Sequence, residues 1–275
     1  PSFFNFRNKS IDSFEFNFKN KFNKLLSTKA VNDVDGINIE ELFKDENKTT
    51  NNGIEICNFI ESEFIKLKAI HCNISSFYLV IHIDTLHVFL MKKFDINDLC
   101  KEQRREINFC QKYSHRCFTP FYGFVKRNEN IIGLIYEYMS NNTLSSYISK
   151  MNKKESEINT MFSFMTMIRI SEGIQYLHSN SLIHRDLKPM NILINHDGIA
   201  YISDFETIRQ INDNTNDKYS NTNDIGSNLY MSPEQYYGEN YSYPTDIYSF
   251  GLIIYFQFTH KNQNNFQMFE KKRAN

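Results

Sequence analysis

An eight-residue segment, His184-Arg185-Asp186-Leu187-Lys188-Pro189-Met190-Asn191, most constrains what this chain can fold into and do. It places an acid, a base and an amide within a few residues of one another. An aspartate such as Asp186 can accept a hydroxyl proton, and Lys188 can neutralise a phosphate. Asn191 and a later acid, Asp204, offer the oxygen ligands that Mg²⁺ prefers. Together these residue types predict a phosphoryl-transfer site.

The residues between Asn191 and Asp204 predict a β-hairpin. Two short apolar runs, residues 192–195 and 199–202, flank Asp197-Gly198, a dipeptide typical of a two-residue turn. In such a hairpin, Asn191 and Asp204 lie opposite each other at the open end, where they can bind one metal ion. The alternative is a polar hairpin end that is simply solvated.

Motifs further along the chain extend this pattern. They are Asp204-Phe205, Tyr230-Met231-Ser232-Pro233-Glu234 and Thr245-Asp246-Ile247-Tyr248-Ser249-Phe250-Gly251. With them, the chain from about Glu63 to about His260 resembles the eukaryotic protein kinases. Lys188-Pro189 and Gly226-Ser227 look like the serine/threonine branch of that family, because tyrosine kinases usually differ at both places.

The resemblance implies an α+β, protein-kinase-like two-lobed fold. Its N-lobe is a small antiparallel sheet with one helix, and its C-lobe is mainly helical. We expect a poorly ordered Phe- and Asn-rich extension over residues 1–60 and a kinase domain over 61–275. The domain divides into an N-lobe at 61–136, a hinge at 137–141 and a C-lobe at 142–275 that lacks the family's last helices. The repeated Phe residues of the extension are alternatively a docking strip.

The resemblance also implies roles for individual residues. Asp186 is the expected catalytic base and Lys188 a phosphate contact, while Asn191 and Asp204 are the expected Mg²⁺ ligands. The residues expected to bind ATP are Lys92, Glu106, Phe77, Leu90, Tyr136, Glu137, Met139 and Leu193. The implied reaction moves the ATP γ-phosphate to hydroxyl groups of a protein substrate.

Two strands are expected early in the N-lobe, at residues 76–80 and 88–94. The second ends in Phe89-Leu90-Met91-Lys92-Lys93-Phe94, which resembles the VAIK motif and makes Lys92 the expected phosphate lysine. Its neighbour Lys93 is the alternative. Because side chains alternate along a strand, the two lysines point to opposite faces.

A helix is expected from about Asn97 to Tyr113, with Asn97 or Asp98 as its N-cap. Steps of three and four residues define one inward stripe, formed by Leu99, Gln103, Glu106, Cys110 and Tyr113. A lone buried carboxylate is costly, and a pair between Glu106 and Lys92 removes that cost. The alternative is that Glu106 edges toward solvent. In the C-lobe, helices are expected at 143–150 and 159–178.

Several positions depart from the family pattern. The Gly-rich loop falls on Ile70, Cys72 and Ser75, or on His71, Asn73 and Ser76, and neither register contains a glycine. Phe77 and Leu90 add atoms to the expected adenine slot, and Tyr136 is a bulky gatekeeper. Glu206 replaces the glycine after Asp204-Phe205. These changes favour an alternative function, a pseudokinase that acts as a binding or scaffold module with weak or no transfer.

The segment from Asp204 to Glu234 is the expected activation segment. Arg185, beside the catalytic aspartate, resembles kinases in which a phosphate orders this segment, and an activating kinase is expected to act on Ser220 or Thr222. The alternative is that both are ordinary solvated hydroxyls.

The chain ends soon after its last apolar run, which raises a third hypothesis, a fragment with Ile253 and Phe256 exposed.

Composition fits a cytoplasmic enzyme. Lys and Arg total 31 against 32 acids, a net charge of -1, so neither nucleic acid nor an anionic membrane is an expected partner. The five cysteines form no CxxC motif and are expected to be reduced. The longest apolar run, residues 247–256, is too short to cross a bilayer and is expected to be a core helix. No signal segment is apparent.

Overall fold

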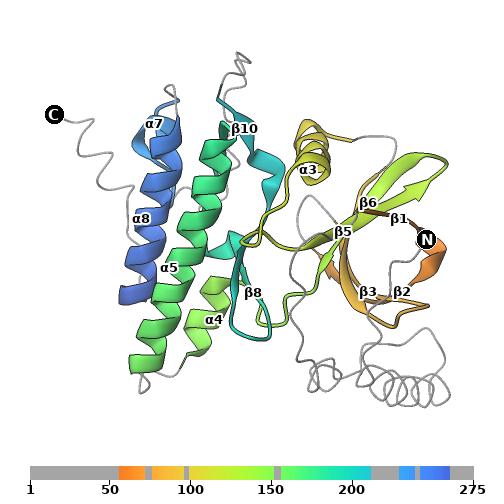
Figure 1. The fold of residues 1–275 in the computed structure, drawn as a ribbon, viewed down its shortest axis with the longest axis horizontal. Coiled ribbons are helices and arrows are strands. Elements are labelled where there is room, and N and C mark those ends of the chain that lie inside the picture. The colour runs from red at the N-terminus through yellow and green to blue at the C-terminus, as the bar shows by residue number, and fades with distance from the viewer. Residues whose placement is uncertain are drawn as a thin grey trace. The chain divides into compact units, whose positions relative to one another are not determined.

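The computed structural model of the 275-residue chain describes residues 56–71, 76–95, 99–151, 156–211, 229–238 and 242–260. The chain divides into two compact units (Figure 1). The first comprises Pro1–Leu99 and Pro120–Tyr138, and the second comprises Cys100–Thr119 and Met139–Asn275. The helix expected within the N-lobe is thus grouped with the second unit. Most of the expected Gly-rich loop, residues 72–75, lies outside the described residues.

The first unit is built on one sheet. Its strands are β1 (Cys57–Ile60), β2 (Phe64–His71), β3 (Ser76–His82), β4 (Val88–Lys93), β5 (Phe121–Arg127) and β6 (Asn130–Glu137). The six strands lie in the order β1-β5-β6-β4-β3-β2, with every neighbouring pair antiparallel except β1 and β5. Strand β1 falls inside the stretch expected to be a poorly ordered extension, so the sheet begins earlier than predicted. Residues 1–55 of that extension lie outside the described residues.

Alternation along the strands gives this sheet two apolar faces. One core cluster gathers Phe64, Val80, Phe89, Met91, Val125, Ile132 and Ile135. A second cluster gathers Leu67, Leu79 and Ile81, with Val88 packed against it. Neighbours along β3 and β4 therefore go to different clusters, as the alternating pattern predicts.

A short 3-10 turn, η1 (Glu61–Glu63), ties β1 to the rest of the sheet. The Glu61 carboxylate forms ion pairs with Lys66 at 3.1 Å, with Lys93 at 2.5 Å and with Arg127 at 2.5 Å. These cations come from β2, β4 and β5. The hydrogen bond from Lys93, reinforced by the other two and opposed by burial, lowers the pKa of Glu61 to about 2.

The second unit is mainly helical. Its helices are α3 (Lys101–Lys112), α4 (Leu144–Lys150), α5 (Ser156–Ser179), α7 (Pro233–Tyr236) and α8 (Tyr243–Thr259). Two-stranded sheets are formed by β7 (Leu182–Ile183) with β10 (Arg209–Gln210) and by β8 (Ile192–Ile194) with β9 (Ala200–Ile202). Single 3-10 turns occur at η2 (Pro189–Asn191) and η3 (Phe205–Thr207).

The helix starts follow local capping chemistry. Helix α4 begins at Leu144 because the Thr143 side chain accepts a hydrogen bond from the backbone of Ser146 at 3.2 Å. Helix α3 begins at Lys101, after Cys100 rather than after Asn97 or Asp98, and those two residues lie outside the described part of the chain. The Gln103 side chain satisfies the Cys100 amide there, at 3.1 Å.

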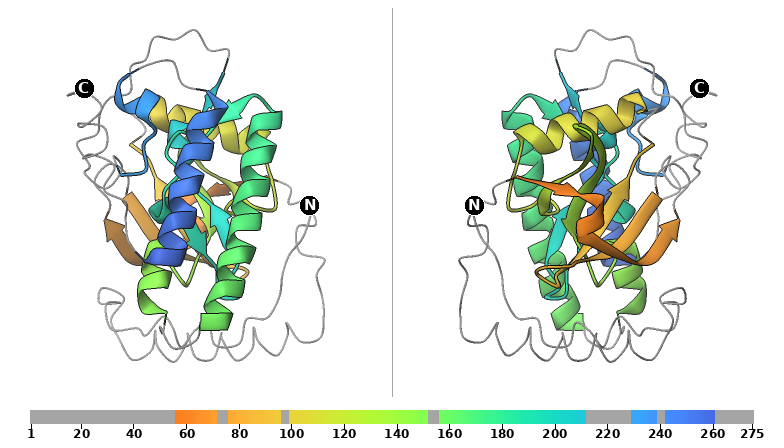
Figure 2. Two further views of the ribbon diagram at one scale, coloured as in Figure 1. Left: turned by 90° about the vertical axis from the view of Figure 1, so that its left-hand side faces the viewer. Right: turned by 90° about the vertical axis from the view of Figure 1, so that its right-hand side faces the viewer.

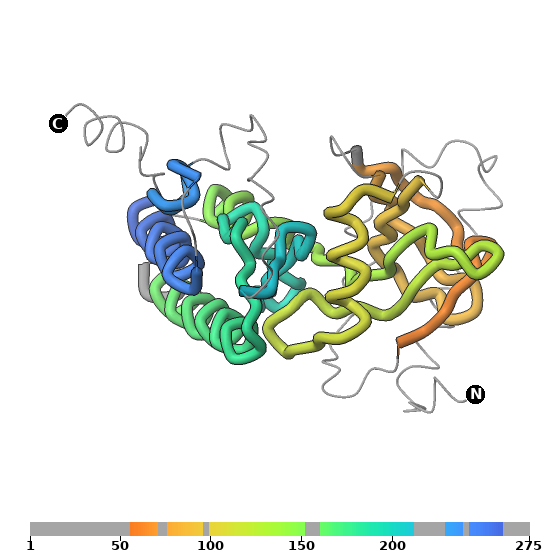
Figure 3. The backbone as a smooth tube through the Cα atoms, turned by 90° about the horizontal axis from the view of Figure 1, so that it is seen from above, coloured from red at the N-terminus to blue at the C-terminus, as the bar shows by residue number. Residues whose placement is uncertain are grey.

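Helices α5 and α8 lie side by side, as the views in Figures 2 and 3 agree. Ile253 and Phe256 of α8 are buried, which contradicts the expectation that both would be exposed. The reason is that α8 is apolar on more than one side, and the side carrying these two residues faces inward. The exposed apolar residues on the two helices are Met161, Phe164, Met165, Ile168, Ile247, Tyr255 and Phe258.

The expectations about membrane-spanning segments and reduced cysteines concern features that the described residues show. Within them, no helix combines the length and the apolar character needed to cross a membrane. Four of the five cysteines are described, and all four are free thiols. Burial raises the pKa of the Cys117 thiol to about 11, so this thiol is inert near neutral pH.

Candidate active site

Asp186 lies in the loop between β7 and η2, with two polar side chains bound to its carboxylate. Lys188 Nζ is 2.8 Å from Asp186 Oδ2. Asn191 Nδ2 donates to the same oxygen at 2.9 Å and to the Asp186 backbone carbonyl at 2.8 Å. Burial raises the pKa of Asp186; Lys188 opposes this shift, whereas the nearby Asp204 adds to it. The structure thus brings together the predicted base, phosphate contact and metal ligands.

The hydrogen bonds of Asn191 orient its amide. Because Nδ2 donates to Asp186, the Oδ1 atom of the same amide points away from that carboxylate. Asn191 is buried in η2, where its backbone N–H donates to the carbonyl of Lys188 at 2.9 Å. The 3-10 turn begins at Pro189, whose fixed φ suits a first helical position.

The hairpin after Asn191 exists, but its predicted turn and register were wrong. Ile192 pairs with Ile202 and Ile194 with Ala200, so the loop has three residues rather than two. The Asn195 side chain accepts hydrogen bonds from the backbone N–H groups two and four residues later, and Gly198 adopts φ 77°. This geometry stabilises the longer loop.

The extra loop residue shifts the open end of the hairpin by one position. The Ser203 N–H donates to the Asn191 carbonyl at 2.9 Å, so Ser203, not Asp204, lies opposite Asn191. Asp204 follows directly, at the start of η3, with a left-handed backbone at φ 65°. A non-glycine residue in this region is strained, and such strain gathers at functional sites.

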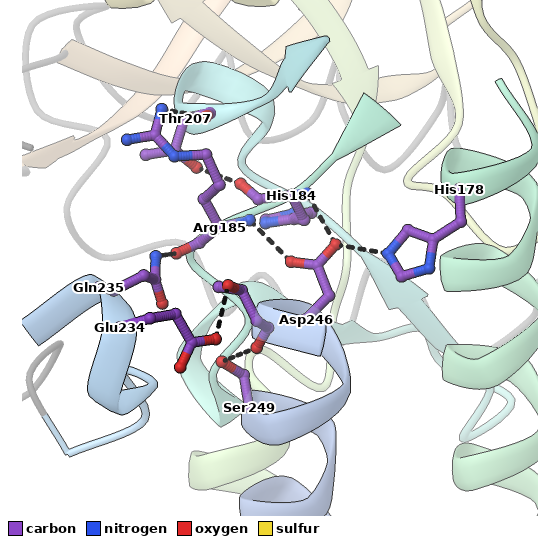
Figure 4. A network of polar contacts seen from close by, with 9 residues as sticks. His178, His184, Arg185, Thr207, Glu234, Gln235, Asp246 and Ser249 are labelled. Carbon is purple, nitrogen blue, oxygen red and sulfur yellow. Dashed lines mark hydrogen bonds and ion pairs between the residues drawn. The ribbon is translucent and has the colours of Figure 1, made fainter. Parts of the chain in front are cut away.

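A buried aspartate on α8 braces the loop that carries Asp186 (Figure 4). Asp246 Oδ2 accepts from the His184 N–H at 2.9 Å, and Oδ1 accepts from the Arg185 N–H at 2.9 Å. The His178 ring of α5 lies 2.9 Å from Oδ2. These bonds hold Arg185 at φ 74°, a second strained residue next to the expected base.

Two further side chains, which the sequence reasoning missed, hold the same loop from other elements (Figure 4). Thr207 Oγ1 of η3 donates to the His184 carbonyl at 2.7 Å. Gln235 Nε2 of α7 donates to the Arg185 carbonyl at 2.9 Å. A signal for Gln235 existed, because Ser232 and Gln235 have the spacing of a capping box. For Thr207 the sequence offered no signal.

Glu234 and its neighbours join α7 to α8. The Thr245 hydroxyl donates to Glu234 Oε1 at 3.0 Å, and the Ser249 hydroxyl donates to the Tyr230 carbonyl at 2.7 Å. Thr245, Asp246 and Ser249 are all buried on α8. The motif that contains Asp246 therefore lies on a helix inside the second unit, as the resemblance implies.

Phe205 connects the end of the hairpin to α3. Its ring stacks on Phe109 of α3 with centroids 4.2 Å apart and meets Phe118 edge-on at 5.1 Å. The His184 ring lies 5.7 Å away on another side. Phe205 is buried by these contacts, so the position of α3 is coupled to the segment that carries Asp204.

Glu106 lies on the buried face of α3, with 2% of its surface exposed. The alternative that it edges toward solvent is therefore wrong. The α3 residues that are buried with it are Gln103, Ile107, Phe109 and Cys110. Met139, at the start of the second unit's long segment, is also buried, and Leu193 lies on β8.

The remaining predicted nucleotide residues belong to the first unit. Lys92 is 4% exposed, and its ammonium lies over the Phe77 ring, 5.4 Å from the centroid. Its neighbour Lys93 is bound to Glu61, which favours Lys92 over Lys93 as the phosphate lysine. Leu90 pairs across the sheet with Tyr136.

The strand β6 ends at the expected hinge. Glu137 accepts a hydrogen bond from the Tyr122 hydroxyl of β5, and its backbone N–H donates to the Pro120 carbonyl at 2.9 Å. The ring of Tyr122 meets Phe89 of β4 edge-on at 4.9 Å. Tyr122 is a further residue that the sequence reasoning missed, because nothing local to it signals a partner at Glu137.

The side chains near Asp186 include oxygen donors that suit a metal ion. Across the described ranges, no three His, Cys, Asp or Glu side chains are grouped as metal ligands. One amide oxygen of Asn191 and the carboxylate of Asp204 are hard donors, and Mg²⁺ commonly takes only one or two protein carboxylates beside water and phosphate oxygens. The residues present therefore fit a magnesium ion that also contacts a bound nucleotide.

Comparison with known proteins agrees with this geometry. A model of the protein kinase domain matches residues 72–273. The chain is 31% identical over 189 residues to mitogen-activated protein kinase kinase 1c of Physcomitrium patens. This match covers 68% of this chain and 47% of that protein. It is 32% identical over 184 residues to mitogen-activated protein kinase kinase 3 of Arabidopsis thaliana, which covers 64% and 33% of the two chains.

A further relative is the serine/threonine-protein kinase pakG of Dictyostelium discoideum, 30% identical over 175 residues, which covers 64% of this chain and 14% of that protein. The chain therefore spans less than half the length of each of these curated relatives.

Proposed function

The chain belongs to the protein kinase family, and on that premise we propose that it transfers the γ-phosphate of ATP to serine or threonine hydroxyl groups of a protein substrate. The names of the relatives support this proposal, because they are serine/threonine kinases or kinase kinases. The observation that carries it is the arrangement of Asp186, Lys188 and Asn191 in one partly buried loop.

The two oxygen atoms of the Asp186 carboxylate have different proposed roles. Oδ2 is bound by Lys188 and Asn191, so Oδ1 is the atom left to face a substrate hydroxyl group. A raised pKa makes this carboxylate a better proton acceptor than an ordinary aspartate. Lys188 then neutralises charge on the phosphoryl group during transfer.

Residues of both units are proposed to bind the nucleotide. Lys92 is proposed to contact the phosphates, and Glu106 is proposed to support nucleotide binding; both side chains are buried. The residues proposed to surround the adenine are Leu90, Tyr136, Glu137, Met139 and Leu193. Asn191 Oδ1 and Asp204 would hold Mg²⁺, which when bound neutralises charge on the phosphate oxygens.

Regulation and location are part of the same proposal. An activating kinase modifies Ser220 or Thr222, which lie outside the described residues, and the phosphate then binds near Arg185. Arg185 is supported in this role by its place beside η3, where its guanidinium donates to the Thr207 carbonyl at 3.3 Å. A cytoplasmic location is supported by the free thiols among the described cysteines.

The test is phosphate transfer from labelled ATP to dephosphorylated casein, followed by identification of the modified amino acid. The Asp186→Asn variant should lose at least about 100-fold in rate, because a general base contributes about 100- to 10,000-fold. Its affinity for ATP with Mg²⁺, measured by thermal shift, should be unchanged. The matched control is Asp197→Asn, the same chemical change on the loop of the β8-β9 hairpin, and its rate should equal that of the wild type.

Other outcomes would change the proposal. Magnesium-dependent ATP binding without transfer by the wild-type chain would favour a pseudokinase, the alternative raised by Phe77, Leu90 and Glu206. Transfer that survives in Asp186→Asn would show that the base is a different residue.

A further inference from the structure

Phe77 and Lys92 are direct cross-strand neighbours in the first unit. Strands β3 and β4 are antiparallel, and their register pairs Phe77 with Lys92. Directly opposed residues point to the same face of a sheet, with their Cβ atoms about 5 Å apart. The Lys92 ammonium accordingly lies over the Phe77 ring, 5.4 Å from its centroid. This distance is within the range of a cation–π interaction.

The surroundings make this contact stronger than a surface pair. Only 4% of Lys92 is exposed, and a cation held against a ring away from water interacts more strongly with it than a solvated one. A lysine side chain has four flexible carbon–carbon bonds, and fixing it costs conformational entropy. A ring that holds the ammonium before any ligand arrives removes part of that cost from the binding step.

The opposite face of β3 offers an internal comparison. Lys66 of β2 lies over the ring of Tyr78, 4.8 Å from its centroid. This lysine side chain is 39% exposed and also contacts Glu61. Adjacent residues of one strand thus carry two cation–π pairs on opposite faces, but only the pair of Phe77 involves the lysine proposed to bind phosphate.

We propose that Phe77 is a positioning residue for Lys92, which holds the ammonium ready for the phosphates of the nucleotide. The inference rests on the proposed function, because it assigns Lys92 to phosphate binding. The sequence had suggested that Phe77 obstructs the adenine slot. In this proposal its ring supports phosphate binding instead. Since Phe77 acts through Lys92, it should affect ligands that carry phosphates and leave adenosine unaffected.

The first experiment compares two variants by their affinity for ATP with Mg²⁺ and for adenosine. Phe77→Leu keeps an apolar side chain but removes the ring, and it should bind ATP about five-fold more weakly, as expected for a partly buried cation–π pair. Its affinity for adenosine should stay within about two-fold of the wild type. Phe77→Tyr keeps the ring and should retain both affinities. The matched control is Tyr78→Leu, which removes the ring of the other pair and should leave ATP affinity unchanged.

The second experiment needs no nucleotide. An amine-reactive ester is added to the free protein, and modification of Lys92 is followed by mass spectrometry with Lys93 as the internal reference. Lys93 is a suitable reference because Glu61, not an aromatic ring, binds it. Phe77→Leu should raise the rate of Lys92 modification about five-fold relative to Lys93, and Phe77→Tyr should not.

Each outcome decides the inference. It is overturned if Phe77→Leu binds ATP as the wild type does, if Phe77→Tyr loses as much affinity as Phe77→Leu, or if adenosine binding falls in parallel with ATP binding. The last result would mean that the ring contacts the base. If the wild type binds no nucleotide, the proposed function fails, and the modification rates alone decide whether Phe77 holds Lys92.

Discussion

The loop around Asp186 and the sheet around Lys92 are stabilised in different ways. In the loop, the strained backbone of Arg185 is held by side chains from α8 and α7, through buried hydrogen bonds of about the same length. In the sheet, apolar packing on both faces and ion pairs of Glu61 at the rim hold the strands. The loop depends on particular atoms, whereas the sheet depends mainly on shape and register.

This difference bears on where bulky side chains can be accommodated. Phosphoryl transfer needs a carboxylate, an ammonium and an amide at set positions, and all three are present around Asp186. A nucleotide-facing sheet needs a cavity of suitable shape, which several side chains can form. The bulky substitutions, Phe77 and Leu90, occur in the sheet, where Phe77 is itself in contact with Lys92.

The largest effect is expected at Asp246. In Asp246→Asn, an amide NH₂ replaces one of the two carboxylate oxygens and faces a backbone N–H or the His178 ring, so a buried donor loses its acceptor. This should cost about 2–3 kcal/mol of the free energy of unfolding, measured by urea denaturation. Phosphate transfer should fall about 100-fold, because one of the bonds that hold the His184-Arg185 backbone is lost.

The control for this change is Ser249→Ala, on the same helix. It removes the hydrogen bond to the Tyr230 carbonyl, should cost about 1 kcal/mol and should leave the rate unchanged. If Asp246→Asn is as stable and as active as the wild type, the loop does not depend on the Asp246 brace, and the contrast with the sheet disappears.

A smaller effect is expected at the rim of the sheet. Glu61→Gln removes the charge that binds Lys66, Lys93 and Arg127 and should cost about 1–2 kcal/mol at neutral pH, a value reduced for solvent screening. Because the pKa of Glu61 is lowered from 4.5 to about 2, this stabilisation is fully present above pH 4.5 and is lost as the pH falls toward 2.

Urea denaturation of the wild type and of Glu61→Gln at a series of pH values measures the pH dependence of this stabilisation. The difference in unfolding free energy between wild type and Glu61→Gln should be constant above pH 5 and shrink below it. A difference that does not change with pH would mean that the carboxylate acts through its shape, not its charge. Transfer activity should change little, which separates this ion-pair cluster from the loop.

The smallest effect is expected at Tyr122. Tyr122→Phe keeps the ring contact with Phe89 but removes the hydroxyl that donates to Glu137. Loss of one partly buried hydrogen bond to a charged group should cost about 1 kcal/mol or less once discounted for exposure, and KM for ATP should rise about two- to three-fold with kcat unchanged. A fall in kcat instead would connect the hinge end of β6 to the chemistry.

Much of the fold and of the site could be predicted from local patterns. The strands expected at residues 76–80 and 88–94 correspond to β3 and β4, and a stripe at steps of three and four residues placed Glu106 on the buried side of α3. The apolar run at residues 247–256 lies in α8, as expected. The turn of the β8-β9 hairpin was wrong by one residue, because the side chain of Asn195 accepts two backbone hydrogen bonds and stabilises a longer loop.

The sequence by itself determined which groups are available for chemistry, since Asp186, Lys188 and Asn191 are close along the chain and their spacing limits their geometry. Only the tertiary structure decided how that loop is held, because Asp246 and Gln235 reach it from more than forty residues away. It also placed Lys93 against Glu61 of η1, 32 residues earlier in the chain. Periodicity and spacing report near neighbours, whereas contacts between distant segments exist only once the chain has folded.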